Sequence, residues 1–240
     1  MKILCHVNRI VKAEILLMPE VVFPIVERFF TLSGEAPTAG QPMYLIRFSG
    51  CNLNCSYCDT PNRNEINEQL TFTELADVIA KVQKEYPGAF VLFTGGEPLL
   101  NERMEAISQL AAKHSDVLFY VETNGSVFIQ DFGKGNLRYV ADWKTFSSGE
   151  GGSFCKNNIK KLRAGLDCIK IVVDKNDLVY VRLIIDAIKK DNPGLDIYLS
   201  PQTGKIDLKD LAAFITENRL DVRLSLQLHK IIWGFDAKGV

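Results

Sequence analysis

The sequence predicts an α/β fold built on a parallel sheet, either open or curled into a barrel. Three observations support this prediction. From residue 43 onward, short β-rich runs alternate with amphipathic stretches of helical period. Unusual polar segments follow the candidate strands, as they do at the carboxyl edge of a parallel sheet, where active sites form. The 240 residues suffice for one domain with a sizeable core, and no linker or internal repeat divides them.

The candidate strands are short runs rich in Val, Ile, Leu, Phe and Tyr, residues that favour a pleated, half-buried surface. We expect strands at residues 43–48, 89–93, 117–121, 137–141, 168–173, 196–200 and 222–227.

Amphipathic patterns predict helices between several of these strands, at residues 71–86, 176–191 and 207–219. The first begins at a capping residue, Thr71 or Thr73, and the second begins at Asn176 and ends in lysines, as helices favour. Residues 144–158 are rich in Gly and Ser and predict a loop. Residues 1–24 carry no motif, so we expect an N-terminal extension there and a single domain over residues 25–240.

The composition is typical of a globular protein, with 47% apolar and 24% charged residues. The formal net charge of −1 gives no electrostatic reason to expect a nucleic-acid or membrane partner. No apolar run is long enough to span a bilayer, and the N-terminus lacks a signal-peptide pattern. Three of the six cysteines form one cluster, unlike a disulfide scaffold. We therefore expect a cytoplasmic protein.

Polar segments follow every candidate strand, and in a parallel barrel they would share one face. We expect these segments to converge on a single site. They are residues 49–60, 94–98, 122–125, 142–144 and 201–204, together with Asp174 and His229.

The first polar segment holds Cys51, Cys55 and Cys58 in the spacing C-x-x-x-C-x-x-C. A structural zinc site would need a fourth ligand, and no other Cys or His is near in sequence. A redox disulfide would leave the third cysteine unexplained. A four-iron cluster normally takes four thiolates, so three thiolates would leave one iron open to a substrate or cofactor. We favour the iron–sulfur interpretation.

This cysteine spacing, with aromatic Tyr57 before the third cysteine and "GGEP" at residues 95–98, resembles the radical S-adenosylmethionine (SAM) superfamily. The resemblance implies a [4Fe–4S] cluster whose open iron binds SAM, and cleavage of SAM to a 5′-deoxyadenosyl radical. It also implies that the Gly-Gly stretch borders the methionine amino group of SAM.

Further segments are similar to the 7-carboxy-7-deazaguanine synthase family. They are residues 27–60, "VETNGS", "DWKTFSSG", "YLSPQ" and "RLSLQLHKIIWGF". The resemblance implies a radical SAM core, a partial (incomplete) TIM-like barrel of about six parallel strands with a reduced helix set. It also implies a homodimer that uses Mg²⁺ and an external electron donor such as flavodoxin or ferredoxin. The implied reaction converts 6-carboxy-5,6,7,8-tetrahydropterin to 7-carboxy-7-deazaguanine with loss of ammonia, in queuosine and deazapurine biosynthesis.

The resemblance assigns roles position by position. Cluster ligands are Cys51, Cys55 and Cys58, and the magnesium ligand is Thr60. SAM contacts are Tyr57, Cys58, Asp59, Gly96, Lys144, Ser147 or Ser148, and Gln202. Substrate contacts are Leu32, Ser33, Gly34, Glu35, Arg47, Thr94 and His229, with Arg47 as the carboxylate-binding residue.

Chemistry supports part of this assignment. A guanidinium fork suits a carboxylate, and magnesium prefers hard oxygen ligands. Without the resemblance, Thr60 would be read as an ordinary turn residue, Arg47 as an outward-facing strand residue and His229 as an isolated C-terminal histidine. Glu122, Asn124 and Asp174 rank second, because turns and strand ends commonly carry such residues.

The sequence departs from the family pattern in two places. The family's Gln-Gly-Glu-Gly loop reads Ser33-Gly34-Glu35-Ala36 here, and the chain continues for eleven residues beyond His229.

Two other functions share some of the features: a glycyl-radical activase, which uses the same cysteine spacing and "GGEP", and an iron–sulfur or zinc binding module without catalysis. The activase would not explain Arg47 or the segments around Thr60 and His229, and spectra with metal analysis would test the binding module.

Overall fold

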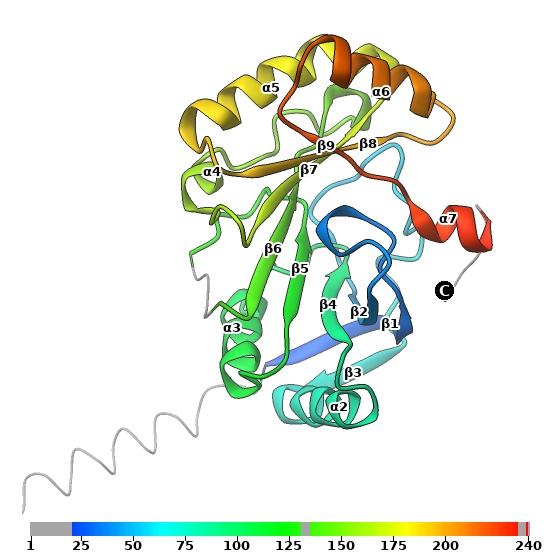
Figure 1. Ribbon diagram of the computed structural model, residues 1–240. Coiled ribbons are helices and arrows are strands. Elements are labelled where there is room, and N and C mark those ends of the chain that lie inside the picture. The colour runs from blue at the N-terminus through cyan, green and yellow to red at the C-terminus, as the bar shows by residue number, and fades with distance from the viewer. Residues whose placement is uncertain (1–20, 131–134, 235–238, 240) are drawn as a thin grey trace, which may run out of the picture.

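The computed structural model describes residues 21–130, 135–234 and 239 (Figure 1). Most of the predicted N-terminal extension, residues 1–20, lies outside the described residues. The elements in chain order are β1 (Val22–Leu32), η1 (Ala36–Thr38), β2 (Pro42–Phe48), β3 (Glu68–Thr71), α2 (Phe72–Glu85), β4 (Phe90–Gly95), α3 (Arg103–Lys113), β5 (Phe119–Thr123), β6 (Leu137–Asp142), η2 (Phe146–Ser148), α4 (Asn157–Lys161), β7 (Cys168–Val173), η3 (Lys175–Asp177), α5 (Leu178–Asp191), β8 (Asp196–Pro201), α6 (Leu208–Glu217), β9 (Arg223–Leu224) and α7 (Leu228–Trp233).

These strands form one curved sheet in the order β3-β1-β2-β4-β5-β6-β7-β8-β9. The strands from β2 to β9 pair in parallel, whereas β1 pairs antiparallel with both β2 and β3. The predicted α/β fold with about six parallel strands is confirmed, since β2, β4, β5, β6, β7 and β8 match six of the predicted runs. The helices predicted at residues 71–86, 176–191 and 207–219 correspond to α2, η3 with α5, and α6.

The last predicted strand, 222–227, is wrong in length, because β9 covers only Arg223–Leu224. The Ser225 amide still donates to Leu199 of β8 at 2.8 Å, and the chain then crosses to the loop before β2. There the Ser225 hydroxyl accepts the Ala36 amide at 2.9 Å, and the Leu228 amide donates to the Gly34 carbonyl at 2.9 Å. His229 therefore lies on α7 rather than directly after a strand.

The sequence analysis also missed several elements, of which β1 and α3, with 11 residues each, are the longest. Strand β1 contains a proline and two charged residues, so it lacks a continuous apolar run. Helix α3 has Glu102 at its N-cap with no side-chain capping hydrogen bond, so the usual start signal is missing. Its buried Ile107 and Leu110 show that packing, not capping, stabilises it.

The main core lies between the outer face of the sheet and the helices that cover it. Fully buried Phe48, Phe93 and Phe119 come from adjacent strands and stack with centroids 5.5 and 5.7 Å apart. In Figure 1, α2 and α3 lie at one end of the molecule, while α5 and α6 cover β7 and β8 at the other.

On the inner face of the sheet, the side chains near the start of the strands form a smaller apolar cluster. The side chains near the ends of the strands are polar. Successive side chains alternate between the two faces of a strand, so Met43, Leu45 and Arg47 share the inner face of β2. The same alternation places an apolar residue and then a polar one on the inner face of the neighbouring strands. These pairs are Leu92 and Thr94, Tyr120 and Glu122, Val140 and Asp142, and Cys168 and Lys170. The polar members form the base of a site at the carboxyl edge.

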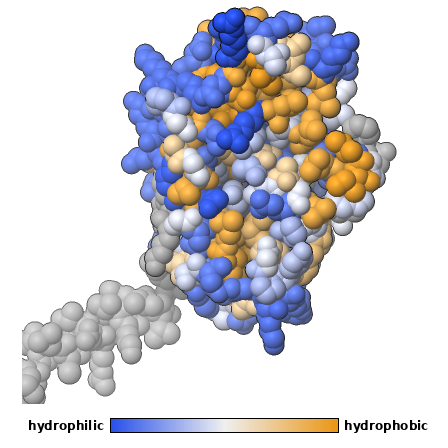
Figure 2. Space-filling model, viewed as in Figure 1, coloured by the Kyte–Doolittle hydropathy of each residue, from blue (hydrophilic) through white to orange (hydrophobic). Residues whose placement is uncertain are grey.

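Among the described residues, none of the helices has the length and apolar character needed to cross a membrane. Large apolar side chains are nevertheless exposed on α7, where Ile231 and Ile232 are 66% and 51% exposed. Figure 2 shows a hydrophobic area at the edge of the molecule where α7 lies in Figure 1.

Candidate active site

The carboxyl edge of the sheet opens into a cavity of about 850 Å³. Segments from β1 to α7 line it, so residues far apart in sequence converge, as the polar segments after each strand predicted. The predicted residues that line it are Leu32, Ser33, Gly34, Glu35, Arg47, Cys51, Cys55, Tyr57, Cys58, Asp59, Thr60, Thr94, Gly96, Lys144, Gln202 and His229.

Ser147 is not among the lining residues. Its hydroxyl donates to the Asp177 carboxylate, away from the cavity, while its carbonyl accepts the Ser56 hydroxyl at 2.8 Å. Ser148 is fully buried, and its carbonyl accepts the Ser56 amide at 2.8 Å. The 3₁₀ turn η2, which contains Ser147 and Ser148, therefore supports the cysteine loop from the side away from the cavity.

The cysteine loop is shaped by its backbone and by neighbouring loops. Gly50 has a φ of 89°, a conformation that favours glycine, and turns the chain out of β2. The Cys51 sulfur accepts the Leu53 amide at 3.5 Å and the Asn124 side-chain amide at 3.8 Å. All three cysteines are half-buried free thiols that face the cavity. Amide donors aimed at a sulfur suit a thiolate that carries negative charge.

The zinc alternative finds no support in this geometry. In the parts of the chain that the structure describes, no three or more His, Cys, Asp or Glu side chains are grouped to hold a metal ion. A mononuclear site needs its ligands to converge on one point. A [4Fe–4S] cluster takes a thiolate on each of several irons, which is the interpretation favoured for these three cysteines.

The "GGEP" segment packs directly under this loop. A Cβ atom on Gly96 would lie 2.0 Å from the Gly50 carbonyl oxygen and 2.9 Å from the Cys51 amide, so only glycine fits there. The Gly96 amide donates to the Phe48 carbonyl at 3.0 Å, and the Glu97 amide donates to the Gly50 carbonyl at 2.8 Å. The segment extends the pairing of β4 with β2 into the cysteine loop and fixes its start.

Glu97 is completely buried and connects this segment to the loop after β5. Its carboxylate accepts the Thr123 hydroxyl at 2.7 Å, the Asn124 amide at 2.7 Å and the Leu99 amide at 3.0 Å. Burial raises the pKa of Glu97, and these hydrogen bonds oppose the rise. Glu97 thus holds Asn124, whose side chain reaches Cys51, in place.

Arg47 lies on the inner face of β2 between two acidic segments. Its Nε donates to Glu27 on β1 at 2.7 Å, and its Nη1 donates to the Thr60 hydroxyl at 3.2 Å. The Thr60 hydroxyl donates to Asp59 at 3.1 Å. Burial would raise the pKa of Asp59, but Arg47 and Lys170 lower it below its ordinary value, so the carboxylate stays charged. The interpretation of Arg47 as an outward-facing strand residue is therefore wrong.

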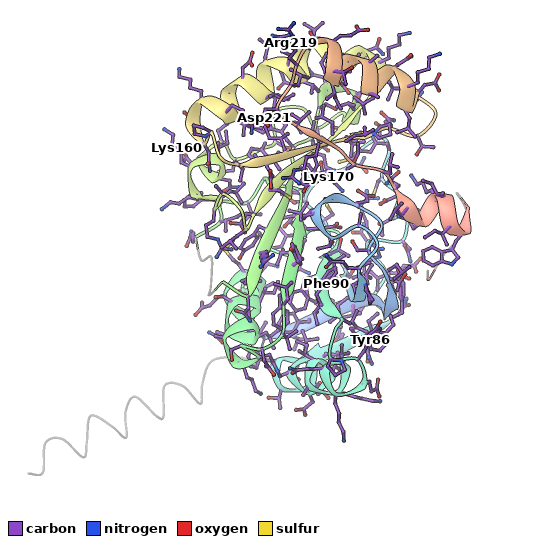
Figure 3. The ribbon with its side chains drawn as sticks, viewed as in Figure 1. Tyr86, Phe90, Lys160, Lys170, Arg219 and Asp221 are labelled. Carbon is purple, nitrogen blue, oxygen red and sulfur yellow. The ribbon has the colours of Figure 1, made fainter. Side chains whose placement is uncertain are left out.

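A second buried charge network crosses the base of the cavity. Lys170, on β7 in Figure 3, donates to Glu35 at 2.7 Å and lies 3.7 Å from Asp142. Asp142 also accepts from Lys144 at 2.9 Å, and Gln227 donates to Glu35 at 2.6 Å. Burial alone would lower the pKa of Lys170, but Glu35, Asp142 and Glu122 raise it well above its ordinary value. Lys170 therefore stays protonated and orients Glu35.

Lys144 connects that network to the cysteine loop, since its ammonium group lies 5.5 Å from the centre of the Tyr57 ring. Burial lowers the pKa of Lys144, but Asp142 more than offsets this, and the pKa lies above its ordinary value. Burial raises the pKa of Tyr57. Two predicted SAM contacts therefore lie next to each other. The Lys144 ammonium group is positively charged, and the Tyr57 ring is neutral.

Opposite the cysteine loop, α7 closes the cavity. A Cβ atom on Gly34 would lie 2.3 Å from His229 Nδ1, so the Ser33–Gly34 backbone and the imidazole are in direct contact. Burial lowers the pKa of His229, with Glu35 opposing, so the ring is neutral near pH 7. Thr94 donates to Glu122 at 3.2 Å, and burial raises the pKa of Glu122.

The sequence analysis missed Glu27, Lys170 and Gln227 as cavity residues. The sequence did contain an indication that Lys170 is functional, because it is the charged residue in the otherwise apolar run "CIKIVV". It contained no such indication for Glu27 and Gln227, since their partners are distant in sequence. Asp174 does not line the cavity and instead caps η3, where it accepts the Asn176 amide at 2.6 Å.

Comparison with known proteins places this site in a family. Residues 45–147, which include the three cysteines and Gly96, match the Radical SAM superfamily. The chain is 35% identical to the 7-carboxy-7-deazaguanine synthase of Clostridium acetobutylicum over 223 residues, which cover 91% of this chain and 99% of that protein. It is 33% identical to the 7-carboxy-7-deazaguanine synthase of Koribacter versatilis, with 90% and 99% covered.

A solved structure supports the fold. The crystal structure of QueE from Escherichia coli aligns with a TM-score of 0.67 at 23% sequence identity, covering 86% of this chain and 94% of that one. The sequence relatives extend over nearly the entire described chain, and the cavity joins the cysteine loop to the predicted substrate residues. The chain belongs to the 7-carboxy-7-deazaguanine synthase family of the radical SAM superfamily.

Proposed function

We propose that this chain catalyses the radical ring contraction of 6-carboxy-5,6,7,8-tetrahydropterin to 7-carboxy-7-deazaguanine, with loss of ammonia, in queuosine biosynthesis. The observation that carries the proposal is one cavity in which the cysteine loop faces Arg47, Glu35 and His229. The family's relatives cover nine tenths of the chain, which favours this function over the glycyl-radical activase.

The cysteine loop fits the cofactors of the superfamily. Cys51, Cys55 and Cys58 would hold the [4Fe–4S] cluster, with Asn124 donating to the Cys51 sulfur. Gly96 packs directly against the Gly50 backbone, where a Cβ would not fit, and so fixes the start of the loop that would hold the cluster. When bound, the cluster and SAM supply the 5′-deoxyadenosyl radical that begins the reaction.

We assign the remaining SAM contacts to Tyr57, Asp59, Lys144 and Gln202, whose side chains line the cavity around the loop. Lys144 is held by Asp142 and stays protonated, which suits the carboxylate of the methionine group. Ser147 supports the loop through its backbone carbonyl, so we assign it a positioning role rather than direct contact.

Substrate recognition falls to Arg47 and to the loop before β2. Arg47 offers a guanidinium to the pterin carboxylate, and the Leu32–Glu35 loop offers backbone groups and one carboxylate to the ring edge. Lys170 and Gln227 donate hydrogen bonds to Glu35 at 2.7 and 2.6 Å and orient its side chain. The family's glutamine is Ser33 here, and its hydroxyl pairs with Thr38 at 2.7 Å. Ring recognition by this loop therefore rests on Glu35, on the backbone and on His229 beside Gly34.

The direct test is anaerobic turnover of the reconstituted, dithionite-reduced protein with SAM, Mg²⁺ and 6-carboxytetrahydropterin. We expect 7-carboxy-7-deazaguanine and one ammonia per turnover, detected by mass spectrometry and an ammonia assay. Cleavage of SAM without deazaguanine product would contradict the proposal.

We assign Mg²⁺ to the Thr60 hydroxyl, which lies between Asp59 and Arg47 at the cavity wall. Thr60→Val keeps the side-chain shape and removes the oxygen ligand. We expect turnover at limiting Mg²⁺ to fall about tenfold or more, as losing a metal-site partner commonly does. The iron–sulfur content should not change. The measurement is a Mg²⁺ titration of the initial rate, with Thr216→Val on α6 as the matched control; identical titrations for wild type and Thr60→Val would remove the assignment.

Gly96→Ala is expected to disturb SAM binding. The new methyl group would meet the backbone at Gly50 and Cys51, so one of the two segments must move. We expect the SAM dissociation constant to rise about tenfold or more, equivalent to about 1.4 kcal/mol. Gly88→Ala is the matched control, because its Cβ would meet only the Tyr86 ring edge at 3.8 Å. Equal SAM affinity in both variants would show that the cysteine loop tolerates the shift.

We further propose a cytoplasmic homodimer that is reduced by an external donor. Clustered free thiols favour a reducing compartment. The exposed Ile231, Ile232 and Trp233 on α7 offer an apolar surface for a second copy of the chain. Light scattering of wild type and Ile231→Asp tests the dimer, and an unchanged mass in the variant would place the interface elsewhere.

A further inference from the structure

Four largely buried ions form a continuous chain across the base of the cavity. Lys144 and Asp142 lie 2.9 Å apart, and the same Asp142 oxygen lies 3.7 Å from Lys170. On its other side Lys170 lies 2.7 Å from Glu35. The charges alternate in sign, so each inner ion is shared by two neighbours. We name this arrangement the four-ion chain and define it by Lys144, Asp142, Lys170 and Glu35.

The backbone holds the middle of the four-ion chain in place. Asp142 is the last residue of β6 and Lys170 lies on β7, and the two are direct partners in the parallel pairing of these strands. The Trp143 amide, next to Asp142, donates to the Lys170 carbonyl at 2.8 Å. The two inner ions therefore stay side by side.

The two ends of the four-ion chain meet different parts of the site. Lys144 lies beside the cysteine loop, 5.5 Å from the centre of the Tyr57 ring. Glu35 belongs to the loop before β2, where its Oε2 atom accepts from Lys170 and its Oε1 atom accepts from Gln227 at 2.6 Å. The four-ion chain therefore joins the cysteine loop to the loop before β2.

Low exposure makes the pairs sensitive to one another. The four side chains are 11–15% exposed, so water screens their charges weakly. Glu122 also acts on the charge of Lys170, but burial raises the pKa of Glu122, and within the described residues no ion pair joins the two. Lys170 is therefore shared chiefly between Glu35 and Asp142.

Asp142 has spare capacity for a cation. In the part of the chain that the structure describes, its Oδ1 atom is buried without a hydrogen-bond partner, while its Oδ2 atom serves both lysines. A carboxylate bound from outside by Lys144 would compete with Asp142 for the ammonium group, and Asp142 would then attract Lys170 more strongly. Lys170 would loosen its hold on Glu35 Oε2, while Gln227 would keep Glu35 oriented through Oε1.

We propose that the four-ion chain couples the binding of SAM to the binding of the pterin. The inference rests on the proposed function, which assigns the SAM carboxylate to Lys144 and the pterin ring edge to Glu35. When Lys144 shares its charge with that carboxylate, Lys170 moves toward Asp142. A Glu35 oxygen then becomes free to accept the donors of the ring, so the pterin binds more tightly. A coupling free energy acts equally in both directions, so bound pterin raises the affinity for SAM by the same factor.

The experiment measures this coupling as a ratio of dissociation constants. 6-Carboxytetrahydropterin is titrated calorimetrically into the anaerobically reconstituted holoenzyme, with and without saturating SAM. No reductant is added, so that no turnover occurs. The coupling ratio is the pterin dissociation constant without SAM divided by the constant with SAM. A substitution that weakens pterin binding equally in both titrations cancels from this ratio, so a merely structural effect leaves it unchanged.

Two variants interrupt the four-ion chain. Asp142→Asn keeps the side-chain shape and breaks the chain at its middle, and Lys170→Met breaks it on the side of Glu35. Asp142→Asn carries the test alone if Lys170→Met does not fold. Lys189→Met is the matched control, because Lys189 on α5 pairs with Asp221 at 2.5 Å and does not line the cavity.

We expect a coupling ratio of about five or more for wild type and for Lys189→Met, and a ratio within about twofold of one for both variants of the four-ion chain. Titration of SAM with and without pterin should return the same ratio for each protein.

A ratio near one for wild type would overturn the proposal. An unchanged ratio in a folded Asp142→Asn or Lys170→Met protein would also overturn it, by showing that the two ligands couple through direct contact. Equal loss of coupling in Lys189→Met would do the same, because the effect would then not depend on these ions. Product formation by wild type together with a ratio near one would refute the coupling alone. Absence of both product and pterin binding would refute the proposed function and the coupling with it.

Discussion

Cys55→Ala is expected to abolish the iron–sulfur absorbance and all cleavage of SAM, and Cys51→Ala and Cys58→Ala are expected to do the same. Three thiolates supply every protein ligand in this assignment, so the loss of one leaves a second iron without its ligand. The loop offers no substitute thiol, since the other side chains between Cys51 and Cys58 are two amides, a leucine, a serine and a tyrosine. The measurements are iron content, the visible spectrum and 5′-deoxyadenosine formation, each on anaerobically reconstituted protein.

Two other cysteines provide matched controls. Cys155 is a half-buried free thiol near the loop, with its amide donating to the Gly125 carbonyl at 2.9 Å. Cys168 is buried on the inner face of β7, and burial raises the pKa of its thiol, which opposes metal binding. Cys155→Ala and Cys168→Ala should therefore retain cluster and activity. A triad variant with a full cluster and full SAM cleavage would show that the ligand assignment is wrong.

The fold and the location of the site could be predicted because both follow from local patterns. Each parallel strand is a short apolar run, and the chemistry-bearing residues come after those runs, so their meeting at one edge follows from topology alone. The alternation along "MYLIRF" even places Arg47 on the same face as Leu45. The position of Arg47 beside Thr60 is the result of this alternation and of the loop that follows the strand.

The parts that could not be predicted depend on contacts between distant segments. The Lys170–Glu35 pair joins residues 135 positions apart, and the Gln227–Glu35 pair joins residues 192 positions apart. No local pattern indicates either partner. The same cause shortened β9, since the chain after Leu224 binds the loop before β2 instead of extending the sheet. Ser147 shows the reverse case, because its family position suggested a ligand contact and its hydroxyl binds Asp177 instead.

Arg47→Ala is expected to remove most of the affinity for the pterin substrate. A desolvated anion left without its partner costs about 2–5 kcal/mol, which corresponds to roughly a 30-fold or greater rise in KM. Arg47→Lys should recover little, because the planar fork reaches Glu27 and Thr60 at the same time and a single ammonium group cannot. SAM cleavage without substrate should survive both changes, since this guanidinium meets the cysteine loop at Thr60, after the last of the three cysteines.

The neighbouring Arg28 supplies the control. It lies on β1 and pairs with Glu68 at 2.7 Å on the side away from the cavity, so Arg28→Ala removes an arginine and an ion pair of the same kind. Its KM for the pterin should match wild type, whereas KM for Arg47→Ala should not. The measurement is the initial rate of product formation against pterin concentration under anaerobic reduction. If Arg47→Ala turned over at low substrate as fast as wild type, the pterin carboxylate would have to lie against another cation of the cavity. Lys170 is committed to Glu35 and Asp142, and Lys144 to Asp142, so Arg63 and Lys230, which also line the cavity and hydrogen-bond to Asn54 and Thr203, would be the next cations to test.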